Sequence, residues 1–137
     1  MAESIVGEKN FAFAVRIVRL YQHLVKTKKE YVMSKQVLRC GTSIGANISE
    51  AIYGQSPKDH LAKMYIALKE CGETLYWLKL LTATEFLTSK QSHSIMQDAL
   101  EIHRILQSIT KTTKEKIEKQ SKITPNSTLH TLHSAFF

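Results

Sequence analysis

Apolar residues recur at steps of three and four along most of the chain, which is the spacing that gathers side chains on one face of an α-helix. The first such segment runs from about residue 8 to residue 26. Its predicted inward stripe consists of Phe11, Ala14, Val15, Val18, Tyr21 and Val25. The polar stretch 27–30 then predicts a connection to a second helix.

The second segment runs from about residue 34 to residue 53, with Ser34 placed as a candidate N-cap and Gly54 as a left-handed C-terminal cap. Its stripe consists of Val37, Leu38, Gly41, Ile44, Ile48 and Ile52.

The third segment has the strongest helix start in the chain, because Ser56 stands as an N-cap before Pro57 at the first helical position. It is predicted to span residues 57–84. Its seam consists of Leu61, Met64, Leu68, Cys71, Leu75 and Leu78. Further apolar side chains fall outside that seam, which predicts a central helix or one that also contacts another subunit. Tyr65, Tyr76 and Trp77 are the candidate interface residues.

The fourth segment is predicted over residues 89–118, where Thr88 or Ser89 caps the start and Gln91 completes a capping box. Its seam consists of Ile95, Ala99, Ile102, Leu106 and Ile109. Residues 120–137 are rich in Ser, Thr and Asn and are expected to form a flexible tail, with docking onto the bundle as the alternative.

Four amphipathic helices with short connections predict an all-α fold, an antiparallel up-down-up-down four-helix bundle over residues 1–119. The composition agrees, because 43% of the 137 residues are hydrophobic and only 5 are Gly and 2 are Pro. No apolar run has the length of a membrane span, and no secretory signal stands at the N-terminus. We therefore expect a cytoplasmic protein, without a membrane, in which Cys40 and Cys71 are free thiols.

The segment from Gln36 to Ala51 is crowded with small residues for a helix interior. Gly41 and Gly45 are four residues apart, so they share a face on which another backbone can approach closely. One interpretation is tight helix packing alone. The other is a helix crossing that also orients Arg39, Asn47 and Glu50 for a shared task.

Carboxylates that face inward in a four-helix bundle raise the question of a metal enzyme. The candidates are Glu50, Glu70 and Glu73. A di-iron site needs a Glu-x-x-His pair on each of two helices, and the chain has none. These carboxylates are instead expected to pair with Arg39, Lys69 or Arg104. A metal-carboxylate enzyme stays as a remote alternative, and no cofactor is expected.

The net charge is +7, and the basic residues are unevenly spread, because those between residues 9 and 39 have only Glu30 as an acidic residue among them. The candidates for contacts with nucleic acid are Arg16, Arg19, Lys26, Lys28, Lys29, Lys35 and Arg39. A second, diluted group consists of Lys111, Lys114, Lys116, Lys119 and Lys122. Such surfaces bind phosphates by charge, with little reading of sequence. An ordinary solvated surface explains the same residues equally well.

Three stretches of the chain resemble the bacterial four-helix-bundle family of 23S ribosomal RNA intervening-sequence proteins. They are 11–18, 34–50 and 67–78, and the resemblance extends over roughly residues 5–115. The family's most specific positions here are Gln36, Arg39, Ser43, Ile44, Asn47, Ile48 and Glu50. Many members have Arg-Arg-Ala where this chain has Leu38-Arg39-Cys40, and Glu-Gly where it has Glu50-Ala51. The first difference leaves one arginine fewer in this segment.

The resemblance implies a homo-oligomer, with a pentamer as the expected state, and related accessory proteins of retroelements are basic rings that bind nucleic acid and a reverse transcriptase. The leading hypothesis is a non-enzymatic, oligomeric protein that binds RNA or DNA or acts as a scaffold. The alternative is an interaction module for a protein partner, such as a reverse transcriptase or an rRNA-processing factor.

Overall fold

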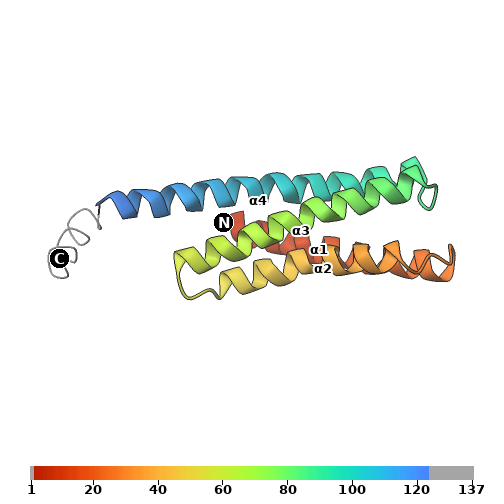
Figure 1. Cartoon of the computed structure of the whole chain (residues 1–137), viewed down its shortest axis with the longest axis horizontal. Helices are drawn as coiled ribbons and strands as arrows, with labels where there is room; N and C mark the ends of the chain where they lie inside the picture. The colour runs from red at the N-terminus through yellow and green to blue at the C-terminus, as the bar shows by residue number, and fades with distance from the viewer. Residues whose placement is uncertain (1, 124–137) are drawn as a thin grey trace, which may run out of the picture.

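The computed structural model describes residues 2–123, which form four helices. They are α1 (Ala2–Lys26), α2 (Met33–Ile52), α3 (Pro57–Ala83) and α4 (Ser89–Ile123). Figure 1 shows each helix running back along the one before it, so that the α1–α2 and α3–α4 connections lie at the same end. The all-α four-helix bundle predicted from periodicity is confirmed. Within residues 2–123, no helix combines the length and the apolar character needed to cross a bilayer.

The connection between α1 and α2 is built around Glu30. Its carboxylate accepts hydrogen bonds from the backbone amides of Val32, Met33 and Ser34, at 3.0, 2.9 and 2.6 Å. Its own amide donates to the carbonyl of Leu24 at 2.9 Å. One residue therefore provides hydrogen-bond partners for free backbone groups at the end of α1 and at the start of α2. The prediction that Ser34 caps α2 was wrong, because Ser34 is buried inside the helix and donates its hydroxyl to the Glu30 carbonyl.

The starts of α3 and α4 are capped as the sequence predicts. The Ser56 hydroxyl accepts from the amide of Asp59 at 3.1 Å, and Pro57 follows at the first helical position. Thr88 and Gln91 form a reciprocal capping box, with bonds of 2.9 and 3.1 Å between each side chain and the other residue's amide. Each cap contributes about 1 kcal/mol to helix stability.

Gly54 does not end α2 in a left-handed conformation, because no glycine in residues 2–123 has a positive φ. A β-carbon on Gly54 would lie 3.0 Å from the Ala51 carbonyl oxygen, so close approach explains the glycine. The two positive φ angles of the described chain belong instead to Lys29 and Glu85, at 56° and 70°. Both follow helix ends, where a left-handed residue is common.

The core confirms the predicted seams of three helices and corrects that of α1. In α4, all five seam residues are buried, and most of the α2 and α3 stripes are buried or packed against the core. In α1, the buried residues are Val6, Asn10, Phe13, Ile17 and Leu24. The predicted stripe faces outward, and Phe11 is 75% exposed. The N-terminal half of α1 carries two apolar faces, and periodicity alone does not choose between them.

Helices α1 and α4 are longer than the sequence pattern predicts. Helix α1 begins at Ala2 and not near residue 8, and α4 continues to Ile123 and not to residue 118. Nearly all residues from 111 to 122 are exposed, and Figure 1 shows this part of α4 projecting past the other helices. Residues 120–123 of the expected tail are therefore helical, and the remainder, 124–137, lies outside the described residues.

Candidate nucleic-acid interface

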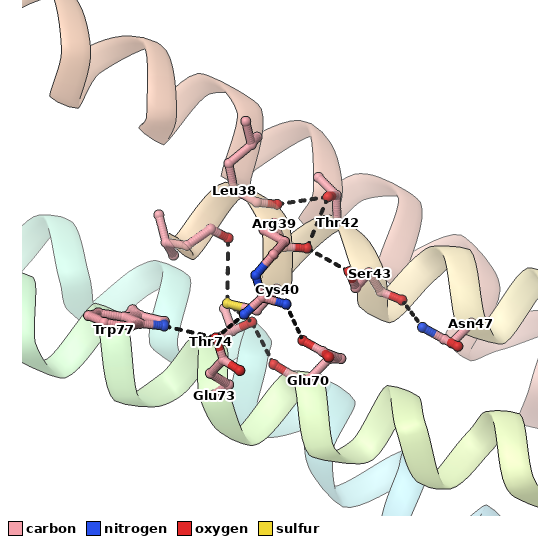
Figure 2. A network of polar contacts seen from close by, with 11 residues as sticks. Leu38, Arg39, Cys40, Thr42, Ser43, Asn47, Glu70, Glu73, Thr74 and Trp77 are labelled. Atoms are coloured by element: carbon pink, nitrogen blue, oxygen red, sulfur yellow. Dashed lines mark hydrogen bonds and ion pairs between the residues drawn. The ribbon is translucent and has the colours of Figure 1, made fainter. Parts of the chain in front are cut away.

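Arg39 of α2 forms a bridge to α3 (Figure 2). Its guanidinium forms ion pairs with Glu73 and, at 3.4 Å, with Glu70. Glu73 also accepts from the indole Nε1 of Trp77 at 3.0 Å, one turn further along α3. The charge of Arg39, whose side chain is half exposed, is thus balanced by carboxylates of the neighbouring helix that the sequence suggested as partners. Arg39 holds two helices together and is poorly placed to serve a phosphate as well.

The two glycines of the small-residue segment face α1. A β-carbon on Gly41 would lie 2.8 Å from the nearest side-chain carbon of Ile17, and one on Gly45 would overlap the amide oxygen of Asn10. Ile17 and Asn10 are both buried. This geometry supports the first interpretation of the segment, in which the glycines allow α1 and α2 to pack closely.

The polar residues of the same segment act within their own helix or between helices. Ser43 donates to the carbonyl of Arg39 at 2.7 Å, and Asn47 donates to the carbonyl of Ser43 at 2.8 Å (Figure 2). Glu50 is exposed and pairs with Lys63 of α3 at 2.8 Å. Gln36 is half-buried. Arg39 and Glu50 lie on α2 with separate partners, so the structure does not bring them together for a shared task.

Both cysteine thiols are free and buried. Burial raises the pKa of Cys71 to about 12, with a smaller effect from the nearby Cys40. Burial likewise raises the pKa of Cys40, against a partly opposing hydrogen bond from Thr74. A thiol that stays protonated at neutral pH is a poor nucleophile. Among residues 2–123, no three His, Cys, Asp or Glu side chains are grouped so that they could hold a metal ion.

The predicted basic residues divide into paired and unpaired sets. Arg16 is held by Asp98 and Arg39 by the α3 carboxylates. Within the described chain, no carboxylate lies at salt-bridge distance from the other members of the set: Arg19, Lys26, Lys28, Lys29 and Lys35. These five cations are the part of the predicted surface that keeps its charge available.

The four lysines of this set lie at one end of the bundle, which we call the basic end: Lys26, Lys28, Lys29 and Lys35. The start of α4 reaches the same end and adds Lys90, which was not among the predicted residues. Glu30 also lies there, but the amides of α2 bind its carboxylate. Glu85 in the α3–α4 connection is exposed. The basic end therefore has a clear excess of positive charge.

The apolar surface lies mainly over α1 and the end of α2. Phe11, Ile52 and Tyr53 are 75%, 49% and 84% exposed, and they line one hollow of about 410 Å³ together with Gly45. Of the predicted interface residues on α3, Tyr65 and Tyr76 are 42% and 57% exposed and Trp77 is half-buried, so none is as exposed as Phe11 or Tyr53. We call the first surface the α1–α2 apolar face, with Phe11, Ile52 and Tyr53 as its members.

The chain is related to known proteins by a family model and by a solved structure. The family model described as 23S rRNA-intervening sequence protein matches residues 2–108. A crystal structure of a protein of unknown function from the S23 ribosomal protein family of Bacteroides thetaiotaomicron is 55% identical, with a TM-score of 0.80. The similarity covers 81% of this chain and 99% of that one. No curated protein is significantly similar to the chain.

Proposed function

Because the chain belongs to the 23S rRNA-intervening sequence protein family, we propose that it is a non-enzymatic, oligomeric protein that binds nucleic acid through its basic end. The observation that carries the proposal is the group of unpaired lysines, Lys26, Lys28, Lys29 and Lys35, at the end of the bundle that also holds the α3–α4 connection. Unpaired surface cations release counterions when they contact phosphates, and this release drives binding that is largely independent of sequence.

The non-enzymatic part of the proposal is supported by the chemistry of the candidate groups. The thiols are buried with raised pKa values, and the carboxylates Glu50, Glu70 and Glu73 form ion pairs with Lys63 or Arg39. Such groups stabilise the bundle and leave no poised acid, base or nucleophile among them.

The oligomeric part is supported by the α1–α2 apolar face. Large apolar side chains grouped on a surface, as Phe11, Ile52 and Tyr53 are, mark sites of protein contact. We assign the homo-oligomer contact, with the pentamer as its expected order, to this face in place of the α3 residues Tyr65, Tyr76 and Trp77.

A second candidate function uses the same apolar face for a different protein. In that case the chain is an interaction module for a reverse transcriptase or an rRNA-processing factor. Co-purification of such a partner with the monomeric chain, resistant to nuclease treatment, would favour this function over self-assembly.

Binding to nucleic acid is tested by titrating single-stranded and duplex RNA and DNA against the full chain at several salt concentrations. The test variant replaces Lys26, Lys28 and Lys35 by Ala. Lys29 is kept, because its positive φ would mix a backbone effect with the charge effect. The control variant removes three exposed cations elsewhere, Lys58, Lys69 and Arg104.

We expect the wild-type affinity to fall steeply with salt, and the slope of log K against log salt to decrease by about 2 to 3 in the test variant. The control variant should keep most of the slope. An absence of binding at low salt, or binding that does not respond to salt, would contradict the proposal.

A further inference from the structure

A hollow of about 490 Å³ lies between α1 and the first turns of α4, beside the basic end. We call it the α1–α4 hollow. Three of its lining residues are apolar, namely Leu20, Leu87 and Ile95, of which the last two are buried. The remaining lining residues are polar or charged: Arg16, Arg19, His23, Lys90, Gln91 and Ser94. The hollow thus combines an apolar floor with a basic rim.

The charges on the rim are of two kinds. Arg16 is engaged, because its guanidinium pairs with Asp98 and donates to the Ser94 hydroxyl at 3.0 Å. Arg19 and Lys90 are exposed, and neither has a carboxylate at salt-bridge distance within residues 2–123. Two cations on opposite walls, one from α1 and one from α4, are therefore free to bind an anionic group.

The polar groups on the α4 side are left as hydrogen-bond donors. The Gln91 carbonyl oxygen accepts from the amide of Thr88, which leaves the side-chain NH₂ group for other partners. The Ser94 hydroxyl oxygen accepts from Arg16, which leaves its proton available to donate. A ligand in the hollow would therefore be recognised through acceptor atoms next to its apolar part.

We propose that the α1–α4 hollow binds one nucleoside phosphate unit, with its base on Leu20, Leu87 and Ile95 and its phosphate between Arg19 and Lys90. This inference rests on the proposed function and names the position where an unstacked nucleotide of a single strand would insert. The same chemistry is offered by a free mononucleotide, so the experiment separates the two sources.

The apolar floor distinguishes this ligand from a simple anion. A bare phosphate gains nothing from contact with Leu20, Leu87 and Ile95, whereas a base has a flat face and acceptor atoms at its edge. The half-buried ring of His23 is of the kind on which bases stack. The volume of the hollow is within the range of sites that hold ligands of this size.

The inference is tested on the full chain by methyl NMR, with the methyl groups of Leu20, Leu87 and Ile95 as reporters. The probes are AMP, adenosine, ribose 5-phosphate, a short single-stranded oligo(A), and the same oligonucleotide in a duplex. One variant, Arg19→Ala with Lys90→Ala, removes the free cations of the rim. Its matched control, Arg104→Ala with Lys58→Ala, removes one exposed arginine and one exposed lysine elsewhere. Ser94→Tyr fills the hollow without changing its charge.

We expect AMP to shift the reporter methyl groups more strongly than adenosine or ribose 5-phosphate does. Its affinity should fall by about tenfold or more in the rim variant and in Ser94→Tyr, and stay unchanged in the control. If single-stranded oligo(A) shifts the same methyl groups and displaces AMP, the nucleotide comes from a strand. If only AMP does so, the hollow takes a free nucleotide.

The proposal is overturned if no probe shifts the reporters, or if the rim variant and Ser94→Tyr bind AMP as the wild type does. Salt-dependent RNA binding that persists in both variants with silent reporters would refute the hollow and leave the proposed function standing. Conversely, AMP bound in the hollow of a chain that binds no nucleic acid would refute the proposed function alone.

Discussion

Gly41 and Gly72 both lie in helix interiors, but only Gly41 has a neighbour where a methyl group would go. Ile17 would lie 2.8 Å from a β-carbon on Gly41, whereas nothing lies within 4 Å of one on Gly72. Ile17 is fully buried, so its side chain has little room to move away. Replacement by alanine should therefore change the stability of the bundle in opposite directions at these two glycines.

We expect Gly41→Ala to destabilise the bundle by about 1–3 kcal/mol, because overpacking outweighs the gain in helix propensity. Gly72→Ala should stabilise it by about 0.5–1 kcal/mol, because only the propensity changes. Urea unfolding followed by circular dichroism measures both free energies. If the two variants shift stability in the same direction, the result contradicts the close packing of Ile17 of α1 against Gly41.

The sequence identified the small-residue segment but not what it faces. The glycine spacing shows that some backbone or side chain approaches α2, and the partner could not be read from local spacing, because Asn10 and Ile17 lie on another helix. The same holds for charge. Arg16 looked like a free cation, because its carboxylate partner Asp98 lies 82 residues away along the chain. For Arg39, a carboxylate partner was expected, but Lys69 and Arg104 were equally possible partners for Glu70 and Glu73, which lie 31 and 34 residues from Arg39.

At the scale of elements, Glu30 ties α1 to α2. Burial alone would raise the pKa of its carboxyl, but the hydrogen bonds from the amides of Met33, Ser34 and Val32 outweigh burial and lower it below the usual 4.5. The unfolded chain then binds a proton at higher pH than the folded chain does. The contribution of Glu30 to stability is therefore complete above pH 4.5 and is lost as the pH falls through the lowered pKa.

We expect Glu30→Gln to cost about 1–2 kcal/mol of unfolding free energy at pH 7, the usual size of a lost cap. The difference from the wild type should shrink as the pH falls below 4.5. Glu85→Gln is the matched control, since Glu85 lies exposed in the α3–α4 connection. Denaturant unfolding at pH 7 and in steps below pH 4.5 provides the comparison, and a difference that is constant with pH would contradict the charged cap.

Sequence patterns predicted α2, α3 and α4 better than they predicted α1 and its connection. A single dominant stripe, such as Ile95 to Ile109, leaves one choice of inward face. Helix α1 offers two, and the pattern favoured Phe11 over Phe13. The Glu30 cap escaped notice because N-caps are usually short side chains next to the helix, as Ser34 was thought to be. A longer carboxylate reaching from the connection has no such signature.

At the scale of the whole molecule, the exposed apolar stripe of α1 is better explained by a contact between chains than by the packing of a single chain. Phe11 lies on α1 and Tyr53 follows the end of α2, and both border the same hollow. Their exposure of 75% and 84% means that the fold of a single chain does not need them. A contact between chains would explain why such side chains are placed together.

We expect Phe11→Ser with Tyr53→Ser to convert the oligomer to monomers without a loss of helix content. The matched control is Tyr65→Ser with Tyr76→Ser, which alters the apolar residues of α3 that the sequence favoured. Light scattering gives the mass, and circular dichroism reports the fold. A monomeric wild type would contradict an oligomer interface on either surface. Dissociation of the control variant alone would show that the interface lies on α3.

The connection built on Glu30 also bears on how quickly the chain finds its fold. Each helix packs on the next one along the sequence, and the α1–α4 contact is the one pairing in residues 2–123 that joins distant parts of the chain. Helical bundles in which most contacts join helices that are neighbours in sequence fold on timescales of about microseconds to milliseconds. Since Glu30 stabilises two helix ends at once, we expect it to favour early formation of the α1–α2 hairpin.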